Sequence, residues 1–301
     1  MCTVTVFTPT YNRRHIINRL FTSLQKQSNK DFEWIVVDDG SSDNTYEELL
    51  EFKKKASFKM NIYKQNNAGK HVAINLGVEK AKGELFFIVD SDDYLREDAI
   101  DLILRIKESI TKDEFAGLAG IRINPKGEMV GTSFKNSFVD CTALEREKYG
   151  INGDKAEVYY TDVLRKYPFP VFEGENFLTE SVVWYRIAND GYKIRWTNEP
   201  FYICDYQIGG LSNTTGKCSR CFNGYQLTTK EMITYKQLPY IIRFKQLLAY
   251  CAIAYKEKKN LRDCSKFVKQ PYFKVWILSR VGFYAYCIKK IATKKRDENE
   301  R

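Results

Sequence analysis

The first 110 residues alternate between two patterns of hydrophobic and polar positions. Short apolar runs typical of strands occupy residues 3–8, 32–39, 60–65 and 84–90. Between these runs, apolar side chains recur at the spacing of a helix. Four strand–helix units in series predict a parallel sheet that is covered by helices.

Each predicted helix is marked by apolar residues that share one face. The members are Ile17, Leu20, Phe21 and Leu24 in the first helix; Tyr46, Leu49 and Leu50 in the second; Ala73 and Leu76 in the third; and Ala99, Leu102, Ile103, Ile106 and Ile110 in the fourth. The second helix follows "SSDNT", a segment rich in residues that cap helix N-termini. We expect these faces to lie on the sheet.

The pattern is mixed after residue 115. Short strands are predicted at 118–123, 129–134 and 193–206, and a helix at 176–189. Residues 209–224 read as an exposed loop that could close over a bound ligand. From there on the chain is predicted to be helical. We therefore expect an α/β domain over 1–224, with a parallel or mixed sheet flanked by helices, and a helical, basic and aromatic region over 225–301.

Composition indicates which partners suit the chain. It has 301 residues, 44% of them hydrophobic, and a net charge of +10, which favours anionic partners such as nucleotide phosphates or an acidic membrane surface. No nucleic-acid-binding module is recognisable, so we expect no nucleic-acid partner. No secretory signal or spanning apolar run stands out, so a cytoplasmic location with free thiols is expected. The single C-x-x-C of Cys218 and Cys221 lacks a second ligand pair, which disfavours a zinc site.

Polar segments follow three of the predicted strands. They are "TPTYNR" at 8–13, "DDGSSDN" at 38–44 and "DSDD" at 90–93. Ligands of open parallel sheets bind beyond the carboxyl ends of the strands, so these segments predict a binding site at that edge. Neither the dinucleotide fingerprint nor the Walker A sequence is present, so any bound phosphates are not held by a glycine-rich cradle.

Three carboxylates stand within four positions at the end of an apolar run. Asp90, Asp92 and Asp93 would repel one another unless a counter-charge is supplied. If strand geometry continues, Asp90 and Asp92 point the same way, and such a pair suits Mg²⁺ or Mn²⁺. The alternative is that Asp92 or Asp93 caps a helix that starts near Arg96.

Taken together, these motifs resemble those of family 2 glycosyltransferases with the GT-A fold, of the bacterial surface-polysaccharide type. The matching pieces are "TPTYNR", "VDDGSSDNT", "NxGKxxAxNxG" (67–77), "AKGE" (81–84) and "DSDD", in the family's order. The match covers about residues 3–95 and extends through about 206. It implies a nucleotide-sugar donor, usually a UDP-sugar, a Mn²⁺ or Mg²⁺ cofactor, and inversion at the anomeric carbon. It also implies a glycan or lipid-linked glycan as acceptor.

The resemblance also implies roles for individual residues. Asp39 would accept a hydrogen bond from the uracil N3–H, Tyr11 would lie near the base, and Lys70 near the diphosphate. Asp92, with Asp90, would hold the metal, and Asp93 would lie close to the transferred sugar among the catalytic residues. The complete donor-binding set is Thr8, Pro9, Tyr11, Asn12, Asp39, Asn67, Lys70, Asp90 and Ser91. Asp38 is expected to hold the turn instead.

An inverting transfer needs a carboxylate to take the proton from the acceptor hydroxyl. The candidates are Glu180 first, Glu175 next, and Glu173. If a helix starts near Asn176, Glu180 shares its apolar face, and partial desolvation would raise its pKa. The family often has a Glu-Asp pair here, whereas this chain has Ser181 in the second position. Glu180 could instead only complement the N-terminus of the helix.

Two other functions fit the sequence less well. A catalytically inactive partner in a glycan-assembly complex is supported only by Ser181. A nucleotidyltransferase would need a glycine-rich and basic phosphate loop after the first strand. The segment found there, "TPTYNRR", offers no such loop.

The basic-aromatic segment 272–295 has two interpretations. It could form helices with a solvated basic face, or lie at a membrane with Phe273, Trp276, Phe283 and Tyr286 among the lipid headgroups. The second interpretation would place the protein at the inner face of the plasma membrane.

Overall fold

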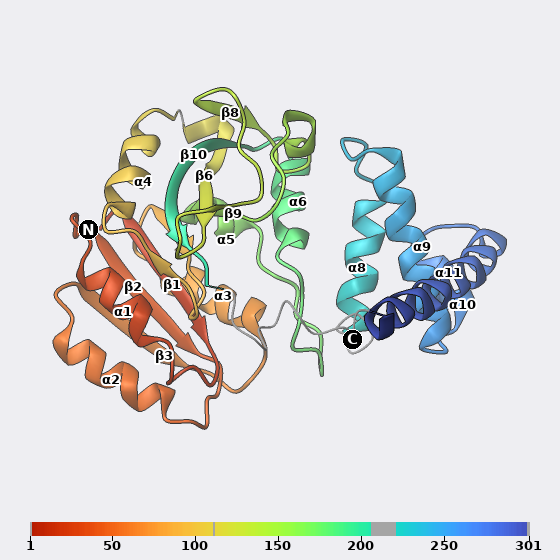
Figure 1. Cartoon of the computed structure of the whole chain (residues 1–301), viewed down its shortest axis with the longest axis horizontal. Coiled ribbons are helices and arrows are strands. Elements are labelled where there is room, and N and C mark those ends of the chain that lie inside the picture. Colours follow the sequence, from red (N-terminus) through yellow and green to blue (C-terminus); the bar gives the residue numbers. More distant parts are fainter. Residues whose placement is uncertain (1, 111, 206–220, 300–301) are drawn as a thin grey trace. The chain divides into compact units, whose positions relative to one another are not determined.

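The structure, a computed structural model, describes residues 2–110, 112–205 and 221–299; the side chains of 112 and 289–299 are outside this description. The chain divides into two compact units, Met1–Thr214 and Thr215–Arg301 (Figure 1). Most of the loop expected at 209–224 lies outside the described residues. Its last part is helical, because the first described helix of the second unit, α8 (Phe222–Met232), begins there.

A single mixed sheet forms the centre of the first unit. One half contains parallel strands in the order β3-β2-β1-β4. These strands are β1 (Val4–Thr10), β2 (Phe32–Asp38), β3 (Lys59–Lys64) and β4 (Leu85–Ile88). Every residue of β1 and β2 is buried, as expected for central strands covered on both faces. The four parallel strands predicted from the apolar runs are confirmed.

The other half of the sheet continues β9-β6-β10-β5. Strand β9 (Lys155–Tyr160) is antiparallel to both β4 and β6 (Phe115–Ile123), and β10 (Lys193–Ile203) runs parallel to β6. Three short strands complete the sheet: β5 (Tyr94–Leu95), β7 (Met129–Val130) and β8 (Phe138–Cys141). The sheet is therefore mixed, within the expected fold class, although β5, β8 and β9 were not predicted.

The helices of the first unit cover the sheet (Figure 1). They are α1 (Asn18–Gln25), α2 (Thr45–Lys55), α3 (Lys70–Lys80), α4 (Ala99–Glu108), α5 (Thr161–Lys166) and α6 (Ser181–Asn189), with 3₁₀ turns at Lys112–Glu114 and Arg146–Tyr149. The predicted inner faces of α1 and α4 are buried, except that Ile110 lies beyond the end of α4 and is only half-buried. In α2 the prediction was wrong for Leu50, which is exposed, because Thr45, Leu49 and Phe52 form the buried face.

Several elements are shorter than predicted, β7 and α6 most clearly. Strand β7 stops at Val130 rather than 134 because Gly131 has a positive φ of 86° and lies against the backbone of Asn152. Helix α6 begins at Ser181 rather than 176. The preceding segment instead approaches Gly69, where an added Cβ would lie 2.0 Å from the carbonyl oxygen of Asn176. This approach brings residues just before α6 to the start of α3.

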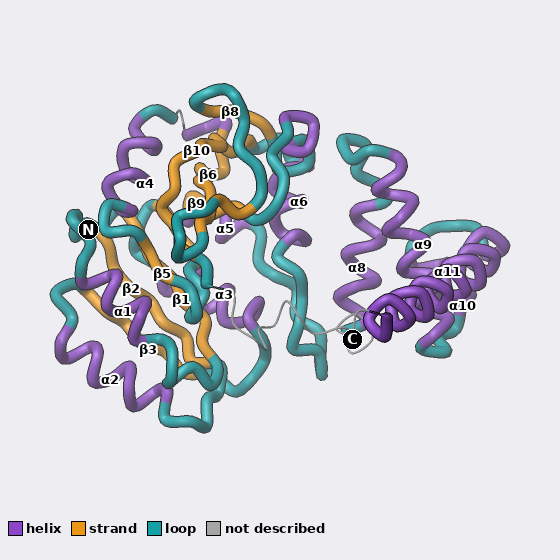
Figure 2. The backbone as a smooth tube through the Cα atoms, in the orientation of Figure 1, coloured by secondary structure: helices purple, strands orange, loops and turns teal. Residues whose placement is uncertain are grey.

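The described residues of the second unit form helices and loops only (Figure 2). After α8 come α9 (Tyr240–Lys256), α10 (Leu261–Phe267) and α11 (Tyr272–Asn299). Their shared core contains Phe222, Leu247, Tyr250, Cys251, Ala254, Cys264, Val268, Val275 and Leu278. The helical prediction for this region is confirmed, and no disulfide joins the cysteines of the described residues.

Gly77 offers a test of how α3 packs on the sheet. A Cβ at this position would lie 2.2 Å from the ring of Phe7 on β1. Ala normally stabilises a helix relative to Gly, but here overpacking should lower the free energy of unfolding of Gly77→Ala by about 1–3 kcal/mol. Urea denaturation measures this, with the exposed Glu79→Ala on the same helix as control. A Gly77→Ala protein as stable as wild type would contradict the packing.

Candidate active site

The predicted edge of the sheet is where the chain changes direction. Strand β1 lies between β2 and β4, so the successive units wind away from it on both sides. Such a switch point opens a crevice at the carboxyl ends of the strands, between the loops that follow β1 and β4. Residues 11–13 and 89–93 form these loops.

The loop after β1 is tied to the loop after β2. The backbone N–H of Asn12 donates to Ser41 Oγ at 2.8 Å, and Asn12 Oδ1 accepts from the N–H of Ser42 at 2.9 Å. Asp38 is buried and accepts from the N–H of Ser41 at 3.0 Å, so it holds this turn as expected. Asn12 has a left-handed φ of 53°, and its amide therefore holds the two loops together.

The other predicted donor-binding residues, at the end of β1 and in the loop after it, differ in accessibility. Thr8 is buried, and its hydroxyl accepts from the indole N–H of Trp34 at 3.0 Å, so this side chain belongs to the core. Pro9 pairs with Val37 within the sheet. Tyr11 is exposed and can meet a ligand. The Thr8 hydroxyl is thus engaged with Trp34, and a role for Thr8 in donor binding stays a prediction.

Asp39 orders the third loop of the site. Its carboxylate accepts from Gln65 Nε2 at 2.7 Å and from the backbone N–H groups of Ala68 and Gly69 at 2.8 and 2.9 Å. These bonds fix the start of α3. The neighbouring Asn67 is exposed. Asp39 thus already serves the fold, and a ligand would have to share a carboxylate that accepts three hydrogen bonds.

The three carboxylates after β4 point to different partners. Strand geometry ends at Ile88, and the backbone turns so that the N–H of Asp93 donates to the carbonyl of Asp90 at 3.1 Å. Asp90 and Asp92 were expected to point the same way if the strand continued through them. Because the strand ends before Asp90, this expectation does not apply. Helix α4 begins at Ala99 after Asp98, so neither Asp92 nor Asp93 caps it. The capping alternative is excluded.

Lys70 supplies the counter-charge for Asp90. Its Nζ lies 2.6 Å from Asp90 Oδ1 and 2.7 Å from Glu180 Oε1, with both Lys70 and Asp90 side chains 30% exposed. Burial alone would raise the pKa of Asp90, but the charges of Lys70 and Arg122 outweigh it and hold that pKa below the usual value. The same two carboxylates raise the pKa of Lys70 although burial opposes this. The ion pair between Lys70 and Asp90 thus keeps both of these groups charged.

Asp93 lies in a different environment. It is buried, accepts from the hydroxyl of Tyr202 at 2.6 Å and accepts from the N–H of Asp205 at 3.1 Å. Burial and the charge of Asp90 raise the pKa of Asp93 to about 6, against the hydrogen bond from Tyr202. Asp90 and Asp93 are thus shifted in opposite directions within one turn of chain.

Arg122 and Tyr202 were not found by sequence reasoning. The guanidinium of Arg122 lies 4.4 Å from the ring centroid of Tyr202 and donates to the carbonyl of Lys155 at 3.0 Å. Tyr202 also accepts from the N–H of Asp90 at 3.1 Å. Arg122 lies on β6 and Tyr202 on β10, and both strands belong to the mixed half of the sheet. No local motif marks them.

Asp92 is the carboxylate that suits a metal ion. It is half-buried and has no hydrogen bond or ion pair with any residue in the described ranges. Those ranges contain no group of three or more His, Cys, Asp or Glu that could enclose a metal. Mg²⁺ and Mn²⁺ bound with substrate phosphates need only one or two carboxylates. The donor set at Asp92, with Asp90 nearby and Ser91 buried between them, fits that kind of site.

The structure also places the candidate bases. Glu180 immediately precedes α6, its side chain is 37% exposed, and it makes no capping hydrogen bond to that helix. The predicted place on the apolar face of the helix is wrong, because α6 starts after Glu180, although the residue is half-buried. Glu175 lies near His71, and Glu173 is exposed. Glu180 is joined to Asp90 through Lys70.

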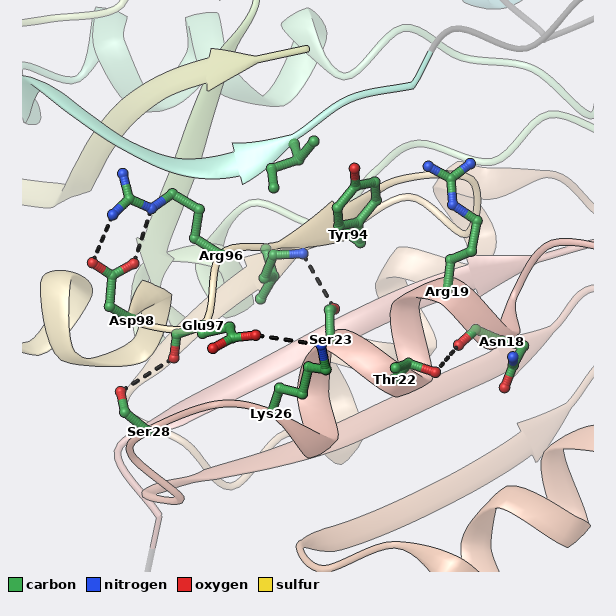
Figure 3. A pocket seen from close by; sticks show the side chains of 12 residues that line it. Asn18, Arg19, Thr22, Ser23, Lys26, Ser28, Tyr94, Arg96, Glu97 and Asp98 are labelled. Carbon is green, nitrogen blue, oxygen red and sulfur yellow. Dashed lines mark hydrogen bonds and ion pairs between the residues drawn. The ribbon is translucent and has the colours of Figure 1, made fainter. Parts of the chain in front are cut away.

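A cavity of about 740 Å³ opens beside the site, between α1 and the start of α4 (Figure 3). Its cations Arg19, Lys26 and Arg96 pair with Asp205, Glu97 and Asp98. Arg19 also lies 4.9 Å from the ring centroid of Tyr94. Each of these cations has an acidic partner, so the cavity does not offer an unpaired positive charge to a ligand. The ion pairs instead hold the segments around the loop that carries Asp93.

Comparison with known proteins bears on this edge of the sheet. The family described as Glycosyl transferase family 2 matches residues 5–161, more than half of the 301 residues. The chain belongs to this family. The match includes the loops of Asp39, Lys70 and Asp90.

Individual relatives match over shorter stretches. Poly(ribitol-phosphate) beta-N-acetylglucosaminyltransferase TarS of Staphylococcus aureus (strain Mu50) is 34% identical over 102 residues, which cover 33% of this chain and 18% of TarS. The chain thus spans about a fifth of the length of this relative.

Solved structures share the fold. TarS residues 1–349 in complex with UDP-GlcNAc has a TM-score of 0.63 at 22% identity, covering 84% of this chain and 73% of that one. The mannosyltransferase PcManGT from Pyrobaculum calidifontis, in complex with GDP-Man and Mn²⁺, has a TM-score of 0.56 at 17% identity, covering 96% and 86%. This confirms the predicted fold class. In the described residues, no helix combines the length and apolarity needed to cross a membrane.

Replacing Lys70 with Met tests the central ion pairs. Two partly buried carboxylates would lose their shared cation, and the free energy of unfolding should fall by about 1–3 kcal/mol at neutral pH. The loss should shrink in acid, where the carboxylates become protonated. Urea denaturation at both pH values measures this, with the exposed Lys82→Met as control. An equal loss in both variants would contradict the assignment.

His71 predicts a second pH dependence. Its ring is buried, with Nδ1 lacking a partner in the described part of the chain, and burial lowers its pKa although Asp39 and Glu175 oppose this. The unfolded chain therefore takes up the proton first, so the free energy of unfolding should fall as pH drops below about 6.5.

The His71→Phe variant should lose less stability than wild type between neutral and mildly acidic pH. The other histidine, His15, is exposed, and His15→Phe should keep the wild-type dependence. Urea midpoints at the two pH values decide this. An unchanged pH dependence in His71→Phe would show that the ring is not buried in its neutral form.

Proposed function

We propose that the protein is an inverting, metal-dependent glycosyltransferase that moves a sugar from a nucleotide-sugar to a hydroxyl of a glycan or lipid-linked glycan. The observation that carries this proposal is the joining of Asp90 and Glu180 through one lysine at the switch point of the sheet. The ion pairs bring a candidate base to the loop that suits a metal and a diphosphate. Family membership supports the same reading.

A UDP-sugar is the proposed donor. The TarS structure in complex with UDP-GlcNAc shares the fold, which makes UDP-GlcNAc the first donor to test here. In this chain the exposed Tyr11 and the Asp39 carboxylate belong to the loops between which the uracil of the donor would lie. Asn67 and Ser91 belong to the loops on its two sides.

Asp92, with Asp90, is proposed to hold Mn²⁺ or Mg²⁺. A divalent ion bound there would stabilise the negative charge that develops on the leaving diphosphate. PcManGT is a neighbour of the same fold that was solved with Mn²⁺. Lys70 would remain as a fixed positive charge close to the diphosphate, since its pKa is raised and it stays protonated at neutral pH.

Glu180 is proposed as the general base, with Glu175 as the second candidate. A base must reach the acceptor hydroxyl, and Glu180 is both partly exposed and held by Lys70. The ion pair with Lys70 would hold the carboxylate in place while the acceptor binds. Asp93, which is buried against Tyr202, is proposed to shape the sugar subsite rather than to accept the proton.

Glu180→Gln separates catalysis from binding. We expect release of UDP from UDP-GlcNAc, with Mn²⁺ present, to fall by about 100-fold or more while donor affinity changes little. Glu173→Gln is the matched control, because Glu173 is exposed in the same segment. A Glu180→Gln protein with wild-type turnover would exclude Glu180 as base and move the assignment to Glu175.

A further inference from the structure

Helix α11 has an inner face that is packed within the second unit. Val275, Leu278, Ser279 and Gly282 are buried at helical spacing. At Gly282 an added Cβ would lie 2.9 Å from the carbonyl oxygen of Leu248 on α9. This face accounts for how α11 is held to its neighbours in the unit.

The opposite face is also apolar. Phe273, Trp276, Ile277, Val281, Tyr284 and Ile288, which we term the outer stripe, recur at i, i+3, i+4, i+8, i+11 and i+15. At 3.6 residues per turn they lie on one side of α11 over about four turns, directly away from the inner face. Their exposed fractions range from 42% to 69%.

A helix that is packed on one side normally carries polar residues on the other. Single exposed apolar residues need no explanation, but a continuous apolar stripe marks a surface that meets a partner. Among the described residues, no helix is long and apolar enough to cross a membrane. The outer stripe therefore suits a partner that contacts the helix along its side.

Charge indicates what that partner is. Residues 215–301 contain 20 Lys or Arg and six Asp or Glu, whereas residues 1–214 contain 28 and 32. The positive excess of the whole chain thus comes from the second unit. Beyond the outer stripe, residues 289–296 add five basic positions in eight. A surface of aromatic and basic residues is attracted to anionic lipid headgroups.

The polar groups along the outer stripe fit a bilayer surface as well. The guanidinium of Arg280 lies 3.7 Å from the ring centroid of Trp276 and 5.3 Å from that of Tyr255. Arg280 is thus a cation laid over aromatic rings, with its charge available to a phosphate. Two copies of so basic a unit would repel each other across a symmetric contact, which disfavours self-association.

We propose that the outer stripe of α11 docks the protein on an anionic lipid bilayer, with the helix lying flat and its aromatic side chains at the headgroup level. This develops the membrane interpretation of segment 272–295 by naming the surface and the lipid charge. It does not depend on the donor site, because vesicle binding requires neither nucleotide nor metal.

Tryptophan fluorescence can follow this contact. The chain has four tryptophans, at 34, 184, 196 and 276, of which Trp276 is the one in the second unit. Vesicles of brominated phosphatidylcholine and phosphatidylglycerol should quench Trp276 in the full chain. Trp276→Phe should remove the quenching while vesicle co-sedimentation remains.

Phe273→Ser combined with Tyr284→Ser should weaken binding to these vesicles by about tenfold or more, because both side chains are exposed and their loss leaves the inner face intact. Val171→Ser, an exposed apolar position in the first unit, is the matched control. Circular dichroism confirms that each variant is folded, and UDP-induced thermal shifts should be equal in all of them.

Three results would overturn the proposal. They are absence of binding to anionic vesicles, equal binding to vesicles of phosphatidylcholine alone, and a dimer in sedimentation velocity that the double variant dissociates. Absence of a UDP-induced thermal shift in the wild type would instead count against the proposed function. It would not affect the proposal that the outer stripe binds a membrane.

Discussion

The ammonium of Lys70 is the charge on which the arrangement of the site depends. It joins the first residue of α3, the loop after β4 and the residue before α6, through contacts of 2.6 and 2.7 Å. These segments are far apart in sequence, and two of them bring carboxylates that would otherwise repel. Arg122 adds a second positive charge from β6. The protein therefore offsets the charge of Asp90 with its own side chains, whereas Asp92, which has no partner among the described residues, is available to a ligand or metal.

The same electrostatics give the three acids different roles. Asp90 is kept ionised by cations, while Asp93 is buried beneath Tyr202 with its pKa raised to about 6. Charge is also distributed unevenly between the two units. The second unit contains both the apolar outer stripe of α11 and the excess of cations. Under the two proposals, one unit handles the donor and the other the membrane surface.

The sequence predicts much of this fold because the apolar runs of the parallel strands and the helical faces are local signals. The loops after β1, β2 and β4 were recognisable for the same reason, as were Asp39, Lys70 and the three acids. Strand β9 could not be predicted, since its antiparallel place between β4 and β6 is set by tertiary pairing. Arg122 and Tyr202 were missed with it, because they reach the site only once β6 and β10 are in register. The start of α6 was predicted too early because the backbone of Asn176 packs closely against Gly69, and the sequence does not reveal this contact between distant segments.

The central claim is that a nucleotide-sugar and a divalent ion meet at Asp92. A thermal-shift panel of UDP, GDP, TDP and several UDP-sugars, each with Mn²⁺ and with EDTA, tests it most directly on wild type and Asp92→Ala. Ligands that bind only the folded state raise its melting temperature. The account predicts stabilisation by a UDP-sugar that is lost with EDTA and in Asp92→Ala. Absence of metal-dependent stabilisation by any of these nucleotides would contradict it.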